Sequence, residues 1–171
     1  ISNSYINLSF PIYSLLKYPK AKIYAVEASP NNFKILQKNI NENSLEDKVK
    51  IYNNIVSSSQ GILPFYISPN SGWSSIYNTR GAKNGELIHL ETLSISQLFS
   101  FNNIVTVDLM KIDIEGGEVD VLTSITNKHL NSLRCLSAEF HRTYDGFDTF
   151  QSNFTDRMSN LGFKHFTVYY G

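Results

Sequence analysis

The chain has 171 residues, 42% of them apolar, which suffices for one globular domain with a hydrophobic core. Its 15 Lys and Arg balance its 15 Asp and Glu, which argues against a broad phosphate-binding surface and so against a nucleic-acid partner. Cys135 is the single cysteine, so no intrachain disulfide framework is possible, and no apolar run approaches the roughly 18 residues of a membrane span. With no signal-peptide pattern, we expect a cytoplasmic protein.

The first part of the chain alternates between predicted helices and strands. Residues 10–17 predict a short helix, with Ser9 as a candidate N-cap and Pro11 in the first turn. Residues 29–43 predict a longer helix, because Ser29 followed by proline is a helix-start signal. Runs rich in β-branched and aromatic residues predict strands at 21–28, 48–56 and 62–68.

The second part of the chain continues this alternation after a loop. Residues 69–85 are rich in Asn, Ser and Gly, which predicts a loop with Trp73 in its middle. Further strands are predicted at 86–95, 106–115, 133–141 and 163–170, and further helices at 96–101, 117–125 and 148–162. The alternation predicts a single α/β domain over residues 1–171, with a mostly parallel sheet between helical layers.

Polar side chains stand at the carboxyl ends of several predicted strands, where ligands bind in such sheets. They are Glu27, Asn53, Asn54, Asp113, Glu115, Glu139 and His141. An acid in the position of Glu27 can accept two hydrogen bonds from a ribose diol. The alternative for Glu27 is that it only complements the N-terminus of the following helix. Each of the other residues alone is equally compatible with a helix cap or a solvated loop.

The stretch KIDIEGGEVDVL, residues 111–122, joins acids to glycines at a strand-to-helix turn. Gly116 and Gly117 would allow the backbone to approach a ligand closely, although an ordinary tight turn also favours glycine. Glu118 falls in the first turn of the predicted helix, where an acid is favoured by the helix dipole alone.

Three segments resemble, in order and spacing, the FkbM-type methyltransferases, which use S-adenosylmethionine. These segments are AKIYAVEASPNNFKILQKNI, VKIYNNIVSSSQG and MKIDIEGGEVDVL, and the resemblance covers residues 1–140. It implies a Rossmann-like class I methyltransferase fold, with a doubly wound sheet whose last strand is antiparallel. It also implies O-methylation of a hydroxyl on a small molecule or a carbohydrate.

The resemblance also implies roles for individual residues. Glu27, with Ala28 beside it, would hold the ribose hydroxyls of the cofactor, Asn54 and Ile55 would border its adenine, and Asp113 would lie beside its methionine end. Methyl transfer to oxygen benefits from a base that takes the hydroxyl proton. Asp113 and Glu115 are the first candidates for that base, and Glu139 and His141 are the second. Paired acids could instead bind a divalent metal, but neither their spacing nor the resemblance calls for one.

The resemblance fails at the glycine loop, which has the form D-x-G-x-N-x-G in the family. Residues 1–9, ISNSYINLS, contain no glycine, and the first glycine of the chain is Gly61. Aligned without gaps, Ile1 replaces the acid, Asn3 the first glycine and Tyr5 the asparagine. On this alignment Asn3, Ser4 and Tyr5 would still contact the cofactor.

Two interpretations of this loop remain open. The domain is either a weakened or catalytically silent relative that serves as a binding module, or a fragment truncated at its N-terminus. The start at Ile1 instead of Met, and the lack of the family's first strand, favour the fragment. A nicotinamide-dependent Rossmann enzyme would explain Glu27 equally well but would leave KIDIEGGE without a role.

Overall fold

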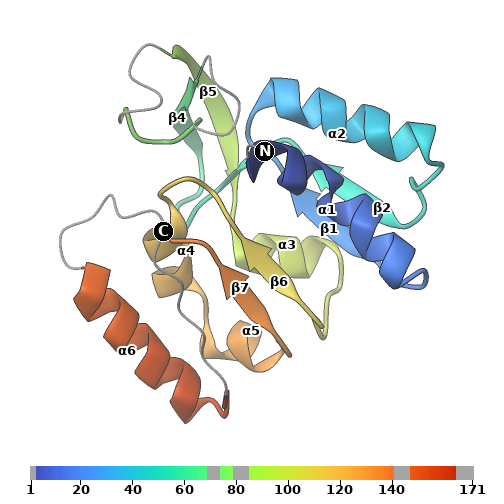
Figure 1. The fold of residues 1–171 in the computed structure, drawn as a ribbon. Coiled ribbons are helices and arrows are strands. Elements are labelled where there is room, and N and C mark those ends of the chain that lie inside the picture. The colour runs from blue at the N-terminus through green and yellow to red at the C-terminus, as the bar shows by residue number, and fades with distance from the viewer. Residues whose placement is uncertain (1–2, 69–73, 79–84, 141–146, 165–171) are drawn as a thin grey trace. The chain divides into compact units, whose positions relative to one another are not determined.

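The computed structural model describes residues 3–68, 74–78, 85–140 and 147–164 (Figure 1). The chain divides into two compact units, residues 1–93 and 94–171. Trp73, His141 and all but the first two residues of the predicted strand 163–170 lie outside the described residues. No helix in the described ranges is long and apolar enough to cross a lipid bilayer.

The first unit begins with two helices that pack on one parallel strand pair. In chain order the elements are α1 (Asn3–Lys17), β1 (Ile23–Val26), α2 (Pro30–Glu42) and β2 (Val49–Tyr52). Strand β1 pairs with β2 from Ile23 opposite Val49 to Val26 opposite Tyr52. The face of this pair that carries Ile23 and Val49 packs against Leu15 of α1 and against Leu36 and Ile40 of α2. Both helices therefore cover the same face (Figure 1).

Helix α2 follows the predicted pattern closely. Ser29 is its N-cap and accepts a hydrogen bond from the Asn32 N–H at 3.4 Å, and Pro30 is the first helical residue. Leu36 and Ile40, one turn apart, are 3% and 2% exposed, so they form the apolar side of the helix. The predicted strand 21–28 and helix 29–43 are confirmed.

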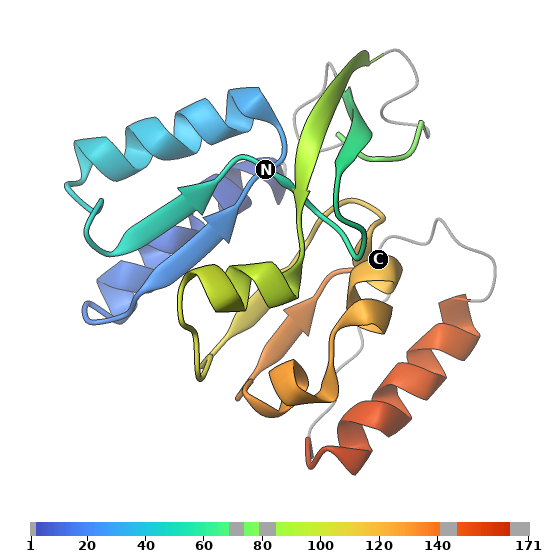
Figure 2. The same cartoon turned by 180° about the vertical axis from the view of Figure 1, so that it is seen from behind.

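A second sheet completes the first unit, with strand order β3-β5-β4. Figure 2 shows its two longer strands, β4 and β5, side by side. The sheet contains β3 (Ile55–Val56), β4 (Ile62–Ile67) and β5 (Glu86–Leu93). Strand β3 runs parallel to β5, whereas β4 pairs with β5 in the antiparallel direction. The predicted strand 48–56 is therefore wrong as one element, because the chain leaves β1 after Tyr52 and pairs with β5 from Ile55 onward.

The second unit is built on another parallel strand pair. Its elements are α3 (Ile95–Phe101), β6 (Met110–Ile112), α4 (Glu118–Ser124), α5 (Asn127–Asn131), β7 (Leu136–Ala138) and α6 (Phe147–Asn160). Strand β6 pairs with β7 from Met110 opposite Leu136 to Ile112 opposite Ala138. Helix α3 has a full capping box, in which Ser94 accepts from the Gln97 N–H while the Gln97 side chain accepts from the Ser94 N–H.

Helix α1 begins earlier than the sequence predicts. It starts at Asn3, so residues 3–9 are helical instead of forming a degenerate loop, and Pro11 lies inside the helix instead of in its first turn. Residues 3–9 contain neither glycine nor proline to interrupt a helix, which is why the helix extends to its early start. Helix α5 was also not expected.

The α/β class and the mostly parallel pairing are confirmed, but the doubly wound sheet is not seen. The described strands form three short sheets, β1-β2, β3-β5-β4 and β6-β7. The physical reason is that no described strand pairs with the second edge of β1 or of β6, so neither ladder is extended. In the first unit, moreover, the described helices lie on one face of β1-β2 and not on both.

Candidate functional site

Glu27 lies directly after β1, at the carboxyl end of the parallel pair. Its N–H donates to the Tyr52 carbonyl at 3.0 Å, which continues the ladder by one residue. Its side-chain Oε1 accepts the N–H of Ser29, the N-cap of α2, at 2.8 Å. The carboxylate is therefore half-buried and held at the start of α2, where the helix dipole favours a negative charge.

The side chain of Asn53 fixes the turn that follows Glu27. Its Nδ2 donates to the Glu27 carbonyl at 2.8 Å and to the Ala28 carbonyl at 2.9 Å. One amide thus satisfies two carbonyls at a strand end, where the ladder no longer supplies donors. Sequence reasoning placed Asn53 at the strand end but gave it no role. Asn53 follows β2 directly, at the position that matches Glu27 after β1, and this position in the sequence is the signal that could have indicated its role.

Of the predicted adenine neighbours, Asn54 lies in the link from β2 to β3, and Ile55 is the first residue of β3. The Asn54 Nδ2 donates to the Glu91 carbonyl of β5 at 3.3 Å. Ile55 is 3% exposed and pairs with Thr92 of β5. Asn3, Ser4 and Tyr5 form the first turn of α1. The cofactor contacts expected of these five residues stay predictions.

The acids Asp113 and Glu139 follow the two paired strands of the second unit at matching positions. Ile112 and Ala138 are the last registered pair, and the Glu139 N–H donates to the Ile112 carbonyl at 2.9 Å. Because side chains alternate along a strand, Asp113 and Glu139 belong to the sheet face that also carries Lys111. The structure thus brings Asp113, one of the two first candidates for the base, and Glu139, one of the two second candidates, to the same edge of the strand pair. Glu139 is exposed to solvent.

Lys111 and Asp113 form an ion pair on this face. The Lys111 Nζ lies 2.7 Å from the Asp113 Oδ2, and the Asp113 side chain is only 8% exposed. A largely buried carboxylate needs such a partner, because burying an uncompensated charge is costly. Sequence reasoning missed Lys111, although an i, i+2 pair of opposite charges on a strand necessarily shares one face.

The turn between β6 and α4 has an unusual backbone. Glu115 has φ 55° and Gly116 has φ 114°, two consecutive residues with positive φ. Such values are routine for glycine but strained for glutamate. Gly117 has φ −85°, which any residue can adopt, so only the first of the two glycines is required by its own dihedral angle.

Glu118 holds this turn from inside the domain. Its Oε1 and Oε2 each accept the Gly116 N–H at 3.0 Å, and Oε1 also accepts the Ile114 N–H at 3.2 Å. The Glu118 residue is 1% exposed. Glu118 does lie in the first turn of α4, as the sequence predicts, and its carboxylate is in addition a buried acceptor for the turn that precedes the helix.

An aromatic cluster anchors the chain beyond Glu139. The Phe140 ring lies 5.3 Å from that of Phe147 and 5.9 Å from that of Phe150, both edge-on and both on α6. Phe140 is thus directed to the opposite face from Glu139, as strand alternation requires. His141 lies outside the described residues, so its role as a base stays a prediction.

These groups are suited to particular chemistry. A half-buried carboxylate such as Glu27 can accept hydrogen bonds from a diol, and carboxylates such as Asp113 and Glu139 can accept a hydroxyl proton or orient a hydroxyl. In the part of the chain that the structure describes, no three His, Cys, Asp or Glu side chains are grouped to hold a metal ion.

Comparison with known proteins gives two matches that agree. Residues 7–164 match the methyltransferase FkbM domain family. The chain is also 27% identical over 158 residues to methyltransferase sdnD of Sordaria araneosa, with 76% of this chain and 61% of that protein covered. The match thus spans less than two thirds of that relative's length. No solved structure matches the chain.

Proposed function

The chain belongs to the methyltransferase FkbM domain family, and on that premise we propose that it is an S-adenosylmethionine-dependent O-methyltransferase. Its acceptor is a hydroxyl group of a small molecule or a carbohydrate. Both compact units then belong to one methyltransferase-like domain of the class I, doubly wound type. The curated relative in Sordaria araneosa is itself called a methyltransferase, which supports the reaction class.

The observation that carries this proposal is the strained turn after Asp113. Residues with sparsely populated dihedral angles persist only where the surrounding structure holds them, and they cluster at functional sites. Glu115 is such a residue, and the buried Glu118 holds the turn in place by accepting the N–H groups of Gly116 and Ile114. An ordinary connection between β6 and α4 would need neither the strain nor a buried acid.

The described residues are suited to hold the ribose of a nucleoside cofactor. Glu27 lies at the carboxyl end of a parallel strand, its carboxylate is oriented by the Ser29 N–H, and its backbone is fixed by Asn53. That is the placement in which an acid accepts two ribose hydroxyls. When bound, S-adenosylmethionine supplies the methyl group that is transferred.

Asp113 is the residue we propose to meet the acceptor hydroxyl. Its carboxylate is oriented by the Lys111 ammonium at 2.7 Å, so it can accept a hydrogen bond from a hydroxyl in a fixed direction. Glu139 lies on the same face and is exposed, which supports a role in accepting the proton and passing it to solvent. Glu115, in the strained turn, is the other candidate that the proposal retains.

Titration calorimetry with S-adenosylmethionine tests the cofactor step. The unmodified chain should bind, and Glu27→Ala should weaken binding about tenfold or more, because two hydrogen bonds to a charged acceptor are lost. Glu46→Ala is the matched control, since Glu46 is an exposed acid of the same unit. Equal effects of the two substitutions would show that Glu27 does not hold the cofactor.

A catalytically silent binding module is the second candidate. The observation that favours it is that residues 3–9 are helical, whereas the family has a glycine loop in this region. A folded, intact gene product that gives no binding heat at millimolar S-adenosylmethionine would support the silent module and rule out the enzyme. Methyl transfer from labelled cofactor to any hydroxyl acceptor would decide for the enzyme.

A further inference from the structure

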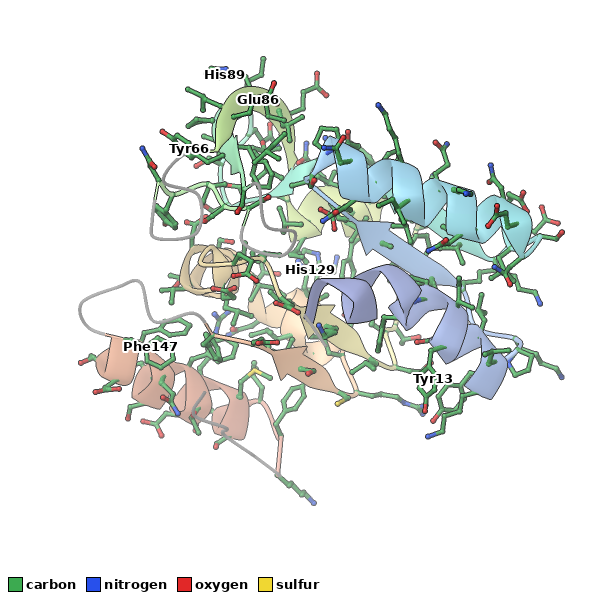
Figure 3. All side chains as sticks on the ribbon, turned by 45° about the horizontal axis from the view of Figure 1, so that its top comes forward. Tyr13, Tyr66, Glu86, His89, His129 and Phe147 are labelled. Carbon is green, nitrogen blue, oxygen red and sulfur yellow. The ribbon has the colours of Figure 1, made fainter. Side chains whose placement is uncertain are left out.

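Helix α1 has an apolar side that faces solvent, in addition to the side that packs on the sheet. Pro11 and Leu15 are buried, as expected for a helix covering β1-β2. Tyr13 and Leu16, three residues apart on another side of the helix, are 63% and 77% exposed, and Tyr18 just beyond the helix is 61% exposed. Figure 3 shows the Tyr13 side chain projecting from α1 away from the β1-β2 pair.

Exposed lysines lie at and just beyond the end of the helix that carries these apolar side chains. Lys17, Lys20 and Lys22 are all exposed, and the Lys17 Nζ lies 5.8 Å from the centre of the Tyr18 ring. The Ala21 N–H donates to the Tyr18 carbonyl at 3.0 Å, so a tight turn keeps the last two lysines close to the end of the helix. The first acid in the sequence is Glu27, so residues 3–26 carry positive charge only.

We propose that this tyrosine–lysine patch, which comprises Tyr13, Leu16, Lys17, Tyr18, Lys20 and Lys22, docks on an anionic lipid surface. Tyrosine rings favour the boundary between lipid headgroups and acyl chains, where one end of the ring is wet and the other is apolar. Lysines beside them extend their charge toward anionic headgroups while their stems lie along apolar surface. The charge of the patch is what selects lipid as its partner over an uncharged apolar surface.

The chain offers an internal comparison for this argument. In the second unit, Phe101 and Val105 are likewise exposed, at 60% and 80%. The charged residues near them in sequence and structure, Asp108 and Arg134, pair with each other at 2.8 Å and so leave no excess of positive charge. This second group has the apolar component of the patch without its charge, and it provides the control variant.

Vesicle sedimentation with the full chain tests the proposal. The probes are vesicles of phosphatidylcholine alone and of phosphatidylcholine with phosphatidylserine, at about 0.1 M salt, where the screening length is about 10 Å. We expect binding to the mixed vesicles, weak binding to the neutral ones, and release at about 1 M salt, where that length falls to about 3 Å. Absence of binding to the mixed vesicles at low salt would overturn the proposal.

Substitutions separate the two components of the patch. Replacing Lys17, Lys20 and Lys22 with Gln should lower the partition coefficient about fivefold for each lysine. Tyr13→Ser with Leu16→Ser should lower it about tenfold or more, because both side chains lose their apolar burial in the headgroup region. Since all five residues are exposed, far-ultraviolet circular dichroism should show that these variants fold normally.

The control variant carries Phe101→Ser and Val105→Ser, and it should bind mixed vesicles like the unmodified chain. If the control loses as much affinity as the patch variants, the proposed location is wrong. Analytical ultracentrifugation provides a further check on Tyr13 and Leu16. If the chain self-associates and the Tyr13→Ser, Leu16→Ser variant abolishes this, the face is an interface between copies and the lipid proposal fails.

Discussion

The Glu118 carboxylate accepts the Gly116 N–H with both oxygens, each at 3.0 Å, from a residue that is 1% exposed. The two residues are only two positions apart, so the bond closes a small loop around the strained φ of Glu115. The carboxylate does not face solvent. The conformation of the segment that joins Asp113 to α4 therefore depends on one buried acid.

Glu118→Ala should lower the free energy of unfolding by about 3 kcal/mol, because it leaves the Gly116 and Ile114 N–H groups without their acceptor. Urea unfolding measures the change. The free energy of unfolding of Glu118→Gln should lie between that of the unmodified chain and that of Glu118→Ala, since the amide keeps one acceptor oxygen. Asp120→Ala, on the exposed side of the same first helical turn, should cost less than about 1 kcal/mol. A Glu118→Ala effect no larger than that of Asp120→Ala would mean that Glu118 does not hold the turn.

The two glycines of this turn should respond differently to alanine. Gly116 has φ 114°, which an L-residue adopts only with strain, so Gly116→Ala should destabilise the domain by about 1–3 kcal/mol. Gly117 has φ −85°, which alanine can adopt, so Gly117→Ala should lower the free energy of unfolding by less than Gly116→Ala does. Thermal unfolding of the two variants side by side provides the measurement. If Gly117→Ala is the more damaging, close approach at Gly117, and not the dihedral angle at Gly116, explains the glycine pair.

Local signals in the sequence predict the elements that depend on neighbours along the chain. Ser29 and Pro30 mark the start of α2, and Leu36 and Ile40 mark its buried side, so the alternation of β1, α2 and β2 could be inferred directly. The early start of α1 could not be inferred in this way, because the family loop led us to expect a turn at residues 3–9. The sequence has no residue there that enforces a turn.

The candidate site is less predictable because its contacts depend on tertiary structure. Asn53 bonds to carbonyls 25 and 26 positions earlier in the chain, which only the β1-β2 register brings within reach. Glu118 in a first helical turn has the sequence signature of a surface acid. Its burial follows from the positive φ of Glu115, which turns the preceding N–H groups toward it, and no pattern in the sequence indicates that dihedral angle.

Arg157 of α6 should be a main stabilising residue of the second unit. Its guanidinium donates to the Leu122 carbonyl at 3.4 Å, to the Ile125 carbonyl at 2.6 Å and to the Asn127 Oδ1 at 2.7 Å. It therefore satisfies the carbonyl end of α4, where a cation is also favoured by the helix dipole. We expect Arg157→Met to lower the free energy of unfolding by about 2–3 kcal/mol in urea.

The matched control for this prediction is Arg134→Met. Arg134 pairs with Asp108 at 2.8 Å, but both side chains are more than three quarters exposed, at 80% and 86%. Exposed ion pairs contribute about 0–1 kcal/mol, so this substitution should have little effect. Equal losses from the two variants would show that the carbonyl contacts of Arg157 add nothing beyond a surface charge.

His129 should make the stability of the second unit depend on pH. Burial lowers the pKa of His129 below its ordinary value of 6.5, and the charge of the neighbouring Lys128 lowers it further. The imidazole packs on Phe99 with 4.7 Å between ring centres, and its Nδ1 lies 3.0 Å from the Thr126 Oγ1. Because the unfolded chain then binds the proton more tightly, stability is complete above pH 6.5 and falls as the pH drops through 6.5 toward the folded pKa.

Urea unfolding between pH 5 and pH 8 tests this dependence, and the proton resonances of the His129 ring report its pKa directly. His129→Gln should remove the part of the pH dependence that lies just below pH 6.5. Lys128→Met should shift the pKa of His129 back toward its ordinary value and make that part smaller. If the slope survives in His129→Gln, another group is responsible, and the packing of His129 on Phe99 does not disfavour its charged form.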